Sequence, residues 1–346
     1  MARCPVPQRL GLPDDAIFQG PSTVSASFSL ALQAAQAAGG AQQYPPSCLY
    51  IVATPIGNLA DITLRALHVL ELVDAIACED TRHTHSMLRA YGIGKSGAQL
   101  IAVHQHNEAQ AAEQVIAHLQ QGQRIAYVSD AGTPGVSDPG ARLCAAVQRA
   151  GLRVSPLPGA SSVTTLISAA GAVTTDADNG GFAFIGFLPT KNQERQQAVA
   201  ALADDPRTLV LLEAPHRIAD LAKALAVLGD RPVTFGRELT KQFEDIATMP
   251  AAALSAWLAE DAKRSKGEFT VVLHPQAASS DDDGNSLRVL KLLIQELPVK
   301  TAVRLTTEIT GAPRNSLYNT ALALKRDVDA DADTDEDLDG TEGDTP

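Results

Sequence analysis

A loop rich in glycine and proline, YVSDAGTPGVSDPG, occupies positions 127–140 and continues the short apolar run QRIAYV. That run is typical of a buried strand, and loops at the carboxyl edge of a parallel sheet are where ligands bind. The loop matches neither the G-x-G-x-x-G fingerprint of dinucleotide-binding proteins nor a P-loop. Its composition therefore argues against an NAD site and a Walker-type ATP site.

The chemistry of the loop favours a cationic ligand. Its first polar side chains are Ser129 and Asp130, and it contains no lysine. A carboxylate repels phosphate but accepts hydrogen bonds from hydroxyl groups and attracts positive groups, while glycines let a ligand approach the backbone amides. S-adenosylmethionine, with an adenosine, an amino group and a sulfonium, meets these requirements. The alternative is a tight structural turn that binds nothing.

Two further loops of the same kind follow other strands. ATPIGN, residues 53–58, has the sharp Pro-x-Gly-Asn turn, and PLPGASS, residues 156–162, places Ser161 and Ser162 at a predicted helix start. Because parallel strands end at one edge of a sheet, we expect the three loops to converge on one cleft.

Candidate acid–base residues come after the second and third predicted strands, on the same edge. In ACEDTRHTH, Glu79 or Asp80 is a candidate general base and Arg82 a candidate phosphate contact. The alternative is that the carboxylate and the arginine pair with each other and only stabilise the loop. In HQHNE, His106 is a candidate base or substrate contact, with structural hydrogen bonding as the alternative; no fourth metal ligand is evident, and we expect no metal.

Basic residues elsewhere carry weaker predictions. Lys191, Arg237 and Lys241 are candidate phosphate contacts, or else solvated side chains and an arginine paired with a nearby glutamate. His216 and Arg217, in EAPHRI, follow a buried strand and belong either to a domain cleft or to the packing of a helix start.

The elements that must position these residues alternate between strands and helices. This alternation predicts an α/β fold with a parallel sheet and helices on both faces. Residues 286–326 change to three helical segments with a net positive charge, suited either to a phosphate backbone or to dimerisation. We predict a disordered extension with at most one short helix (1–46), two α/β domains (47–165 and 166–275), a linker (276–285), the helical module (286–326) and a disordered acidic tail (327–346).

Charge and cysteine content limit the partners and the compartment. The formal net charge is −12, but the tail alone holds ten acids and no base, and subtracting them leaves −2. A polyanionic partner is therefore compatible with the rest of the chain. The four scattered cysteines fit a reducing cytoplasm, and no apolar window is long enough for a membrane span.

The motifs quoted above, with GFLPTK and GRELTKQFE, occur in an order that resembles the ribosomal RNA small subunit methyltransferase I family, within the tetrapyrrole (class III) methylases. The resemblance covers about residues 48–326. It implies two α/β domains with S-adenosylmethionine in the cleft between them, a homodimer, and 2'-O-methylation of a cytidine in the decoding region of 16S rRNA within the small subunit. The cofactor contacts it implies are Pro55, Gly57, Asp130, Gly132, Thr133, Pro134, Ser161, Ser162, Leu212 and Ala214.

Two other functions remain open from the sequence. One is methylation of a tetrapyrrole or a protein by an enzyme of the same superfamily. The other is a non-catalytic, RNA-binding assembly factor that keeps a methylase fold but binds no cofactor.

Overall fold

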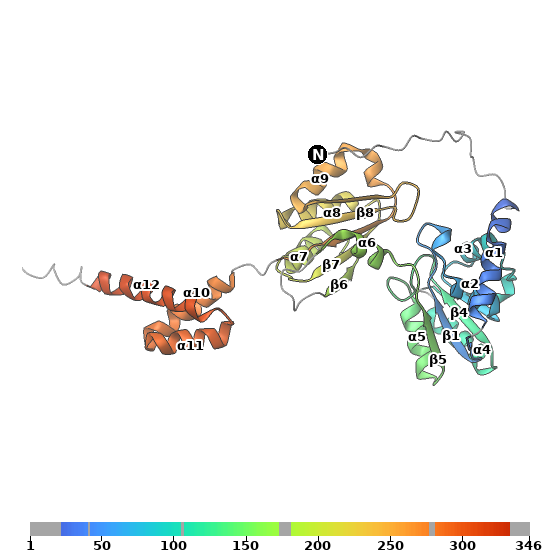
Figure 1. The fold of residues 1–346 in the computed structure, drawn as a ribbon, viewed down its shortest axis with the longest axis horizontal. Coiled ribbons are helices and arrows are strands. Elements are labelled where there is room, and N and C mark those ends of the chain that lie inside the picture. The colour runs from blue at the N-terminus through green and yellow to red at the C-terminus, as the bar shows by residue number, and fades with distance from the viewer. Residues whose placement is uncertain (1–21, 41, 105–106, 173–180, 277–280, 333–346) are drawn as a thin grey trace, which may run out of the picture. The chain divides into compact units, whose positions relative to one another are not determined.

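The computed structural model describes residues 22–40, 42–104, 107–172, 181–276 and 281–332 (Figure 1). The chain divides into two compact units that interleave in sequence. The first contains the described chain up to Ala170 together with Phe235–Ala247 and Gly267–Thr270. The second contains Gly171–Thr234, Thr248–Lys266 and the described residues from Val271 onward. Two short segments from the predicted second domain thus belong to the first unit.

The first unit is built on a parallel sheet with the order β3-β2-β4-β1-β5. Its strands follow the predicted apolar runs, and a helix follows each strand, as expected for parallel connections. The strands are β1 (Cys48–Val52), β2 (Ala75–Cys78), β3 (Leu100–Ala102), β4 (Arg124–Val128) and β5 (Arg153–Leu157). The helices are α1 (Ser22–Gly39), α2 (Leu64–Leu72), α3 (Thr81–Tyr91), α4 (Glu108–Gln120), α5 (Gly140–Arg149) and α6 (Ser162–Ala170).

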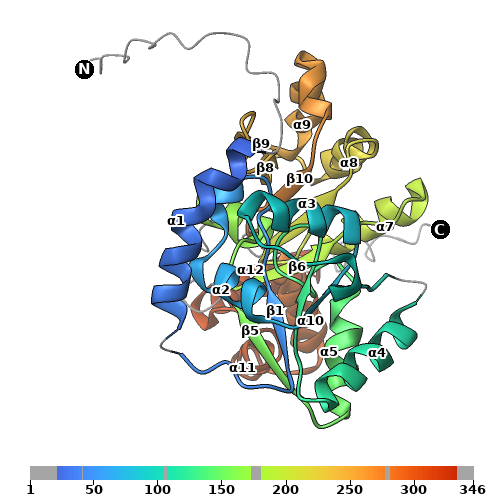
Figure 2. The ribbon, with the colours of Figure 1, turned by 90° about the vertical axis from the view of Figure 1, so that its right-hand side faces the viewer.

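Both faces of this sheet are buried because successive side chains of a strand point to opposite sides. Cys48, Tyr50 and Val52 of β1 face a core formed with α1, α2 and α3. Leu49 and Ile51 face a second core formed with α4 and α5, which lie side by side (Figure 2). The near-continuous apolar runs of the sequence follow directly from this burial on two faces.

The loops after β1 and β4 leave the sheet on opposite faces although these strands are neighbours. The chain passes from β1 to α2 on one face and from β4 to α5 on the other. Such a switch point opens a crevice at the carboxyl ends of the strands, where open α/β sheets bind their ligands. The order of strands therefore places the crevice beside the glycine-rich loops that follow β1 and β4.

The helix α1 is longer than the short helix predicted within residues 1–46. Its apolar side, with Phe28, Ala31, Leu32 and Ala35, packs against α2 and α3 (Figure 1). The ring of Phe28 meets Tyr91 edge-on, with 4.9 Å between the ring centroids. An alanine-rich composition hides this role, because a few apolar contacts on one face are enough to dock a helix. Residues 1–21 lie outside the described residues.

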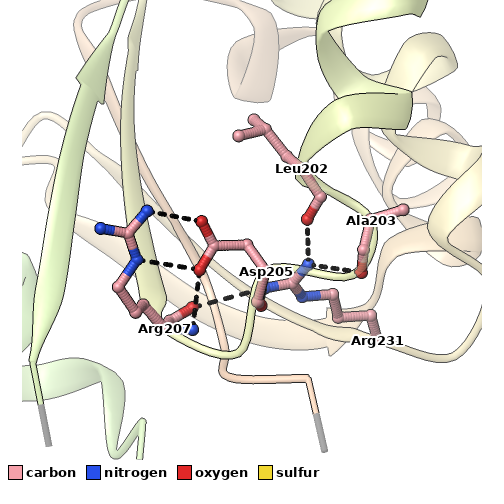
Figure 3. A network of polar contacts seen from close by, with 5 residues as sticks. All are labelled: Leu202, Ala203, Asp205, Arg207 and Arg231. Atoms are coloured by element: carbon pink, nitrogen blue, oxygen red, sulfur yellow. Dashed lines mark hydrogen bonds and ion pairs between the residues drawn. The ribbon is translucent and has the colours of Figure 1, made fainter. Parts of the chain in front are cut away.

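The second sheet has the order β6-β7-β10-β8-β9, and β6 and β7 pair in parallel. The guanidinium of the buried Arg231 donates hydrogen bonds to the backbone carbonyls of Leu202, Ala203 and Asp205, and so fixes the chain between α7 and β7 (Figure 3). The elements are β6 (Phe182–Gly186), α7 (Asn192–Leu202), β7 (Thr208–Glu213), α8 (Ile218–Leu225), β8 (Pro232–Arg237), β9 (Asp245–Pro250), α9 (Leu254–Glu260) and β10 (Phe269–Leu273).

The predicted helical module forms α10 (Asp281–Glu296), α11 (Val299–Thr310) and α12 (Arg314–Ala332). The three helices pack on one another around a small core that includes Leu290, Val303 and Leu317. Gly311, with φ 76°, ends α11 in the left-handed conformation that the turn into α12 requires. None of the helices in the described ranges is long and apolar enough to cross a membrane. The predicted fold class, α/β with a parallel sheet and C-terminal helices, is confirmed.

We expect Ala35→Asp to lower the free energy of unfolding by ~3 kcal/mol, because Ala35 is fully buried and the new carboxylate would have no partner. Ala34→Asp is the matched control, since Ala34 is exposed on the same helix. Urea unfolding of both variants measures the difference. Equal stability of the two variants would mean that α1 does not dock on α2 and α3.

Candidate functional site

The three glycine- and proline-rich loops meet, as the sequence predicts. Thr54, after β1, and Gly132, after β4, exchange two backbone hydrogen bonds of 3.0 Å, and the Thr54 hydroxyl donates to the carbonyl of Ser129. Thr133 Oγ1 donates to the carbonyl of Ala160 in the third loop at 2.9 Å. The loops are thus linked at the switch point by backbone hydrogen bonds and by two threonine hydroxyls.

Two glycines allow this close approach. Gly132 has φ +83°, and a Cβ there would lie 3.3 Å from Ile56 Cγ2. A Cβ at Gly159 would lie 2.6 Å from the Cβ of Ala53, which is closer than two carbon atoms tolerate. A side chain at either position would push the loops apart.

A cavity of about 540 Å³, a size typical of small-molecule sites, opens beside these loops. One wall consists of Pro55, Ile56, Gly57, Asp130 and Ala131, from the first two loops. Leu59 and the helix α3 form a second wall. Lys241 and Glu268, from the two inserted segments, complete the lining. All of these residues belong to the first unit.

One carboxylate oxygen of Asp130 accepts a hydrogen bond that fixes the side chain, and the other is available to a ligand. Its Oδ1 accepts a hydrogen bond from the backbone N–H of Asp80 at 3.1 Å. Its Oδ2 accepts no hydrogen bond from the described residues. A carboxylate that lines the cavity in this way is suited to bind a hydroxyl or a cationic group of a ligand.

Glu79 has the properties of a proton acceptor. Burial, and then the charges of Asp130 and Asp138, raise the pKa of Glu79 above its ordinary value. A raised carboxyl pKa is closer to the range in which a general base operates efficiently. Glu79 is half-buried directly after β2, at the carboxyl edge of the sheet.

Asp80 and Arg82 follow the structural alternative. The Asp80 carboxylate caps α3 by accepting from the N–H groups of Arg82 and His83, and it forms a two-point ion pair with the Arg82 guanidinium. The hydrogen bonds from Arg82 hold the pKa of Asp80 well below its usual range. A carboxylate that binds protons so weakly is a poor general base. The Arg82 side chain is 90% exposed, and its role as a phosphate contact stays a prediction.

The other predicted residues occupy different places. Pro134 is buried and is not among the residues that line the cavity, and Ser162 is the first residue of α6. Leu212 is the penultimate residue of β7, and Ala214 directly follows that strand. Leu212 and Ala214 lie in the second unit, and their role as cofactor contacts stays a prediction. His106 lies outside the described residues.

The wall formed by α3 was not predicted. His83, Ser86, Met87 and Ala90 line the cavity at intervals of three, four and seven residues from the first, which is the spacing of one helical face. Asp80 as N-cap and Gly92 as C-cap, with φ 81°, mark the ends of this helix. These cap residues are a sequence signal for the helix, but nothing in the sequence says which of its faces lines a cavity.

Comparison with known proteins identifies the family. Residues 48–255 match the tetrapyrrole (corrin/porphyrin) methylases, and residues 280–325 match the RsmI C-terminal HTH domain. The ribosomal RNA small subunit methyltransferase I of Escherichia coli O157:H7 is 49% identical over 277 residues, which cover 79% of this chain and 94% of that protein. The chain belongs to the ribosomal RNA small subunit methyltransferase I family. It is therefore a methyltransferase, and its family membership implies S-adenosylmethionine as methyl donor.

The chain is also similar to a second curated relative and to a solved structure. The protein of the same name from Pasteurella multocida (strain Pm70) is 45% identical over 278 residues, covering 79% of this chain and 96% of the relative. A uroporphyrin-III-C-methyltransferase structure from Thermus thermophilus is 22% identical, with a TM-score of 0.46, and covers 65% of this chain and 94% of that one. The helix α1 precedes the residues that match the methylase family.

We expect Gly159→Ala to weaken the binding of S-adenosylmethionine and to lower stability by ~1–3 kcal/mol, because the new methyl group overlaps Ala53 and separates two loops. Gly97→Ala is the control, since a Cβ at Gly97 meets nothing within 4 Å. Isothermal titration calorimetry and urea unfolding measure both effects. Donor affinity equal to that of the control would show that the contact between these loops is not needed for binding.

Proposed function

We propose that the protein transfers a methyl group from S-adenosylmethionine to the 2'-hydroxyl of a cytidine ribose in the decoding region of 16S rRNA. The observation that carries this proposal is the cavity at the switch point of a methylase fold, lined by Asp130 and by the loop after β1. The relatives named above are small subunit rRNA methyltransferases, which supports the substrate class.

The lining of the cavity fits an adenosyl donor. Ile56, Leu59 and Met87 offer apolar surface to a flat base, and the loop glycines leave backbone groups within reach of a ligand. The open oxygen of Asp130 is suited to an amino group, a ribose hydroxyl or the positive charge of a sulfonium. The donor, when bound, supplies an activated methyl group; the chain has to orient it and the acceptor in line.

Glu79 is the residue that we propose as general base. A ribose hydroxyl is a poor nucleophile and gains from a nearby group that accepts its proton. The pKa of Glu79 is raised, whereas that of Asp80 is lowered by its pairing with Arg82. Glu79 therefore takes up a proton at the carboxylate more readily than Asp80 does.

The helical module supports an RNA substrate. Arg288, Lys291, Lys300 and Arg314 are exposed on α10, α11 and α12, and the matching family domain is of the helix-turn-helix type. Exposed cations of this kind bind phosphate backbones without reading sequence. We also propose that the protein acts as a cytoplasmic homodimer on the assembled or nearly assembled small subunit.

Purified protein incubated with tritiated S-adenosylmethionine should label 30S subunits that lack this modification more strongly than free 16S rRNA, and should not label a porphyrin precursor. Mapping of 2'-O-methylation then locates the labelled cytidine. Labelling of the porphyrin alone would favour the tetrapyrrole alternative. Donor binding by the protein is checked in parallel by calorimetry, and its absence would favour the non-catalytic assembly factor.

We expect Glu79→Gln to abolish most methyl transfer without lowering stability near neutral pH. The pKa of Glu79 in the folded state is above its value in the unfolded state. Ionisation of Glu79 therefore lowers the free energy of unfolding as the pH rises from the unfolded-state pKa through the folded-state pKa. The variant should therefore be more stable than wild type near neutral pH, and the difference should vanish in acid, where Glu79 is protonated in both states.

Asp80→Asn is the control, and its expected effect on the free energy of unfolding has the opposite sign. The pKa of Asp80 is lowered in the folded state, so its negative charge stabilises the fold. It should lose stability near neutral pH and keep more activity than Glu79→Gln. Urea unfolding across pH and single-turnover methylation measure both quantities. Full activity of Glu79→Gln would exclude Glu79 as the base.

A further inference from the structure

The segment Glu238–Lys241 lies against the loop after β1, residues 53–58, although the two are far apart in sequence. It follows β8, and it belongs to the first unit together with the residues around Glu268. Thr240 Oγ1 accepts a hydrogen bond from the backbone N–H of Asn58 at 3.2 Å, across 182 positions of the chain. The contact joins this segment to the turn that carries Pro55 and Gly57.

The backbone of this segment is held in an unusual conformation. Glu238 and Thr240 have φ angles of 51° and 65°, in the left-handed region that residues other than glycine rarely adopt. Such conformations persist only where the surroundings enforce them, and they concentrate at functional sites. Thr240 carries a β-branched side chain, for which the conformation is especially unfavourable.

Ion pairs join the two ends of this segment to each other and to Glu268. Lys241 Nζ lies 3.0 Å from Glu238 Oε1 and 3.1 Å from Glu268 Oε2. Glu238 Oε1 also accepts from the backbone N–H of Glu268 at 2.9 Å. Burial alone would lower the pKa of Lys241, but the hydrogen bonds to the two carboxylates outweigh it and raise that pKa. The ammonium group therefore stays charged and shared between two partners.

The network reaches the cavity through Gly57. A Cβ at Gly57 would collide with Cγ of Lys241 and would lie 3.0 Å from the carbonyl oxygen of Leu239. Lys241 and Glu268 line the same cavity as Gly57 and Asp130. The lysine stem thus packs directly against the turn at the wall of the cavity.

We propose that Lys241 is a positioning residue for the methyl donor: its ion pairs with Glu238 and Glu268 hold residues 238–241 against Gly57 and Asn58 and so set the shape of the donor cavity. The proposal rests on the proposed function of that cavity. It assigns Lys241 a different task from the phosphate contact that the sequence suggests, because its charge is already shared between two carboxylates.

The test compares Lys241→Met, which keeps the alkyl stem but removes the charge, with wild type and Lys241→Arg. We expect Lys241→Met to bind S-adenosylmethionine about tenfold more weakly, with kcat at saturating donor within about twofold of wild type. Lys241→Arg retains a charge that can bond both carboxylates and should recover an affinity within about threefold of wild type. Calorimetry gives the affinities, and single-turnover methylation of the small subunit gives the rates.

Lys191→Met is the matched control. Lys191 also pairs with a glutamate three residues away, Glu194, but this pair is exposed and belongs to the second unit. It should leave donor affinity unchanged. Glu268→Gln gives a second measurement that does not depend on folding of Lys241→Met, since the Glu268 side chain is 73% exposed; we expect an affinity about threefold weaker.

Three outcomes distinguish the proposals. If Lys241→Met and Glu268→Gln bind the donor as wild type does, Lys241 is not a positioning residue, and a raised KM for the ribosomal substrate alone would identify it as a phosphate contact. If wild type binds no donor, the proposed function fails instead. If thermal unfolding shows equal losses of stability in Lys241→Met and Lys241→Arg, with equal losses of affinity, the role is structural only and the proposal is overturned.

Discussion

The pair of hydrogen bonds between Thr54 and Gly132 is the contact on which the candidate site depends. It joins the loops after β1 and β4, two neighbouring strands whose connections leave on opposite faces of the sheet. Without it the two loops would diverge with their helices. With it, the Pro55–Gly57 turn and Asp130 line a single cavity. The backbone parts of this wall lose little conformational entropy when a ligand binds.

The interleaving of the two units adds a second constraint. Residues 235–247 and 267–270 belong to the first unit, although the chain on both sides of them builds the second. They bring Lys241 and Glu268 to a cavity whose other residues come from the first 131 positions. Their contacts with Gly57 and Asn58 support the Pro55–Gly57 turn in a way that its own sequence neighbourhood does not.

Some charged side chains near the cavity are paired with each other, and others are left without an ion-pair partner among the described residues. Asp80 and Arg82 pair with each other at the start of α3, and Lys241 is shared between Glu238 and Glu268. Asp130 keeps one oxygen open, and Glu79 is left half-buried with a raised pKa. These contacts support the proposed roles of Asp130 in ligand binding and of Glu79 in proton transfer.

Local patterns were enough to predict most strands of the α/β units, the three glycine-rich loops and the C-terminal helices, but not α3, α7, α9 or β9. Apolar runs, turn residues and helical periodicity act over a few residues and can be read directly. The packing of α1, the α3 wall, the pairing of Asp80 with Arg82 in preference to a free carboxylate, and the support of Gly57 by Lys241 needed the tertiary structure. These depend on which of several possible partners a residue meets, and for Asn58 and Thr240 that partner lies 182 positions away. Sequence spacing says nothing about contacts at that distance, because only the order of strands and the interleaving of the units bring such segments together.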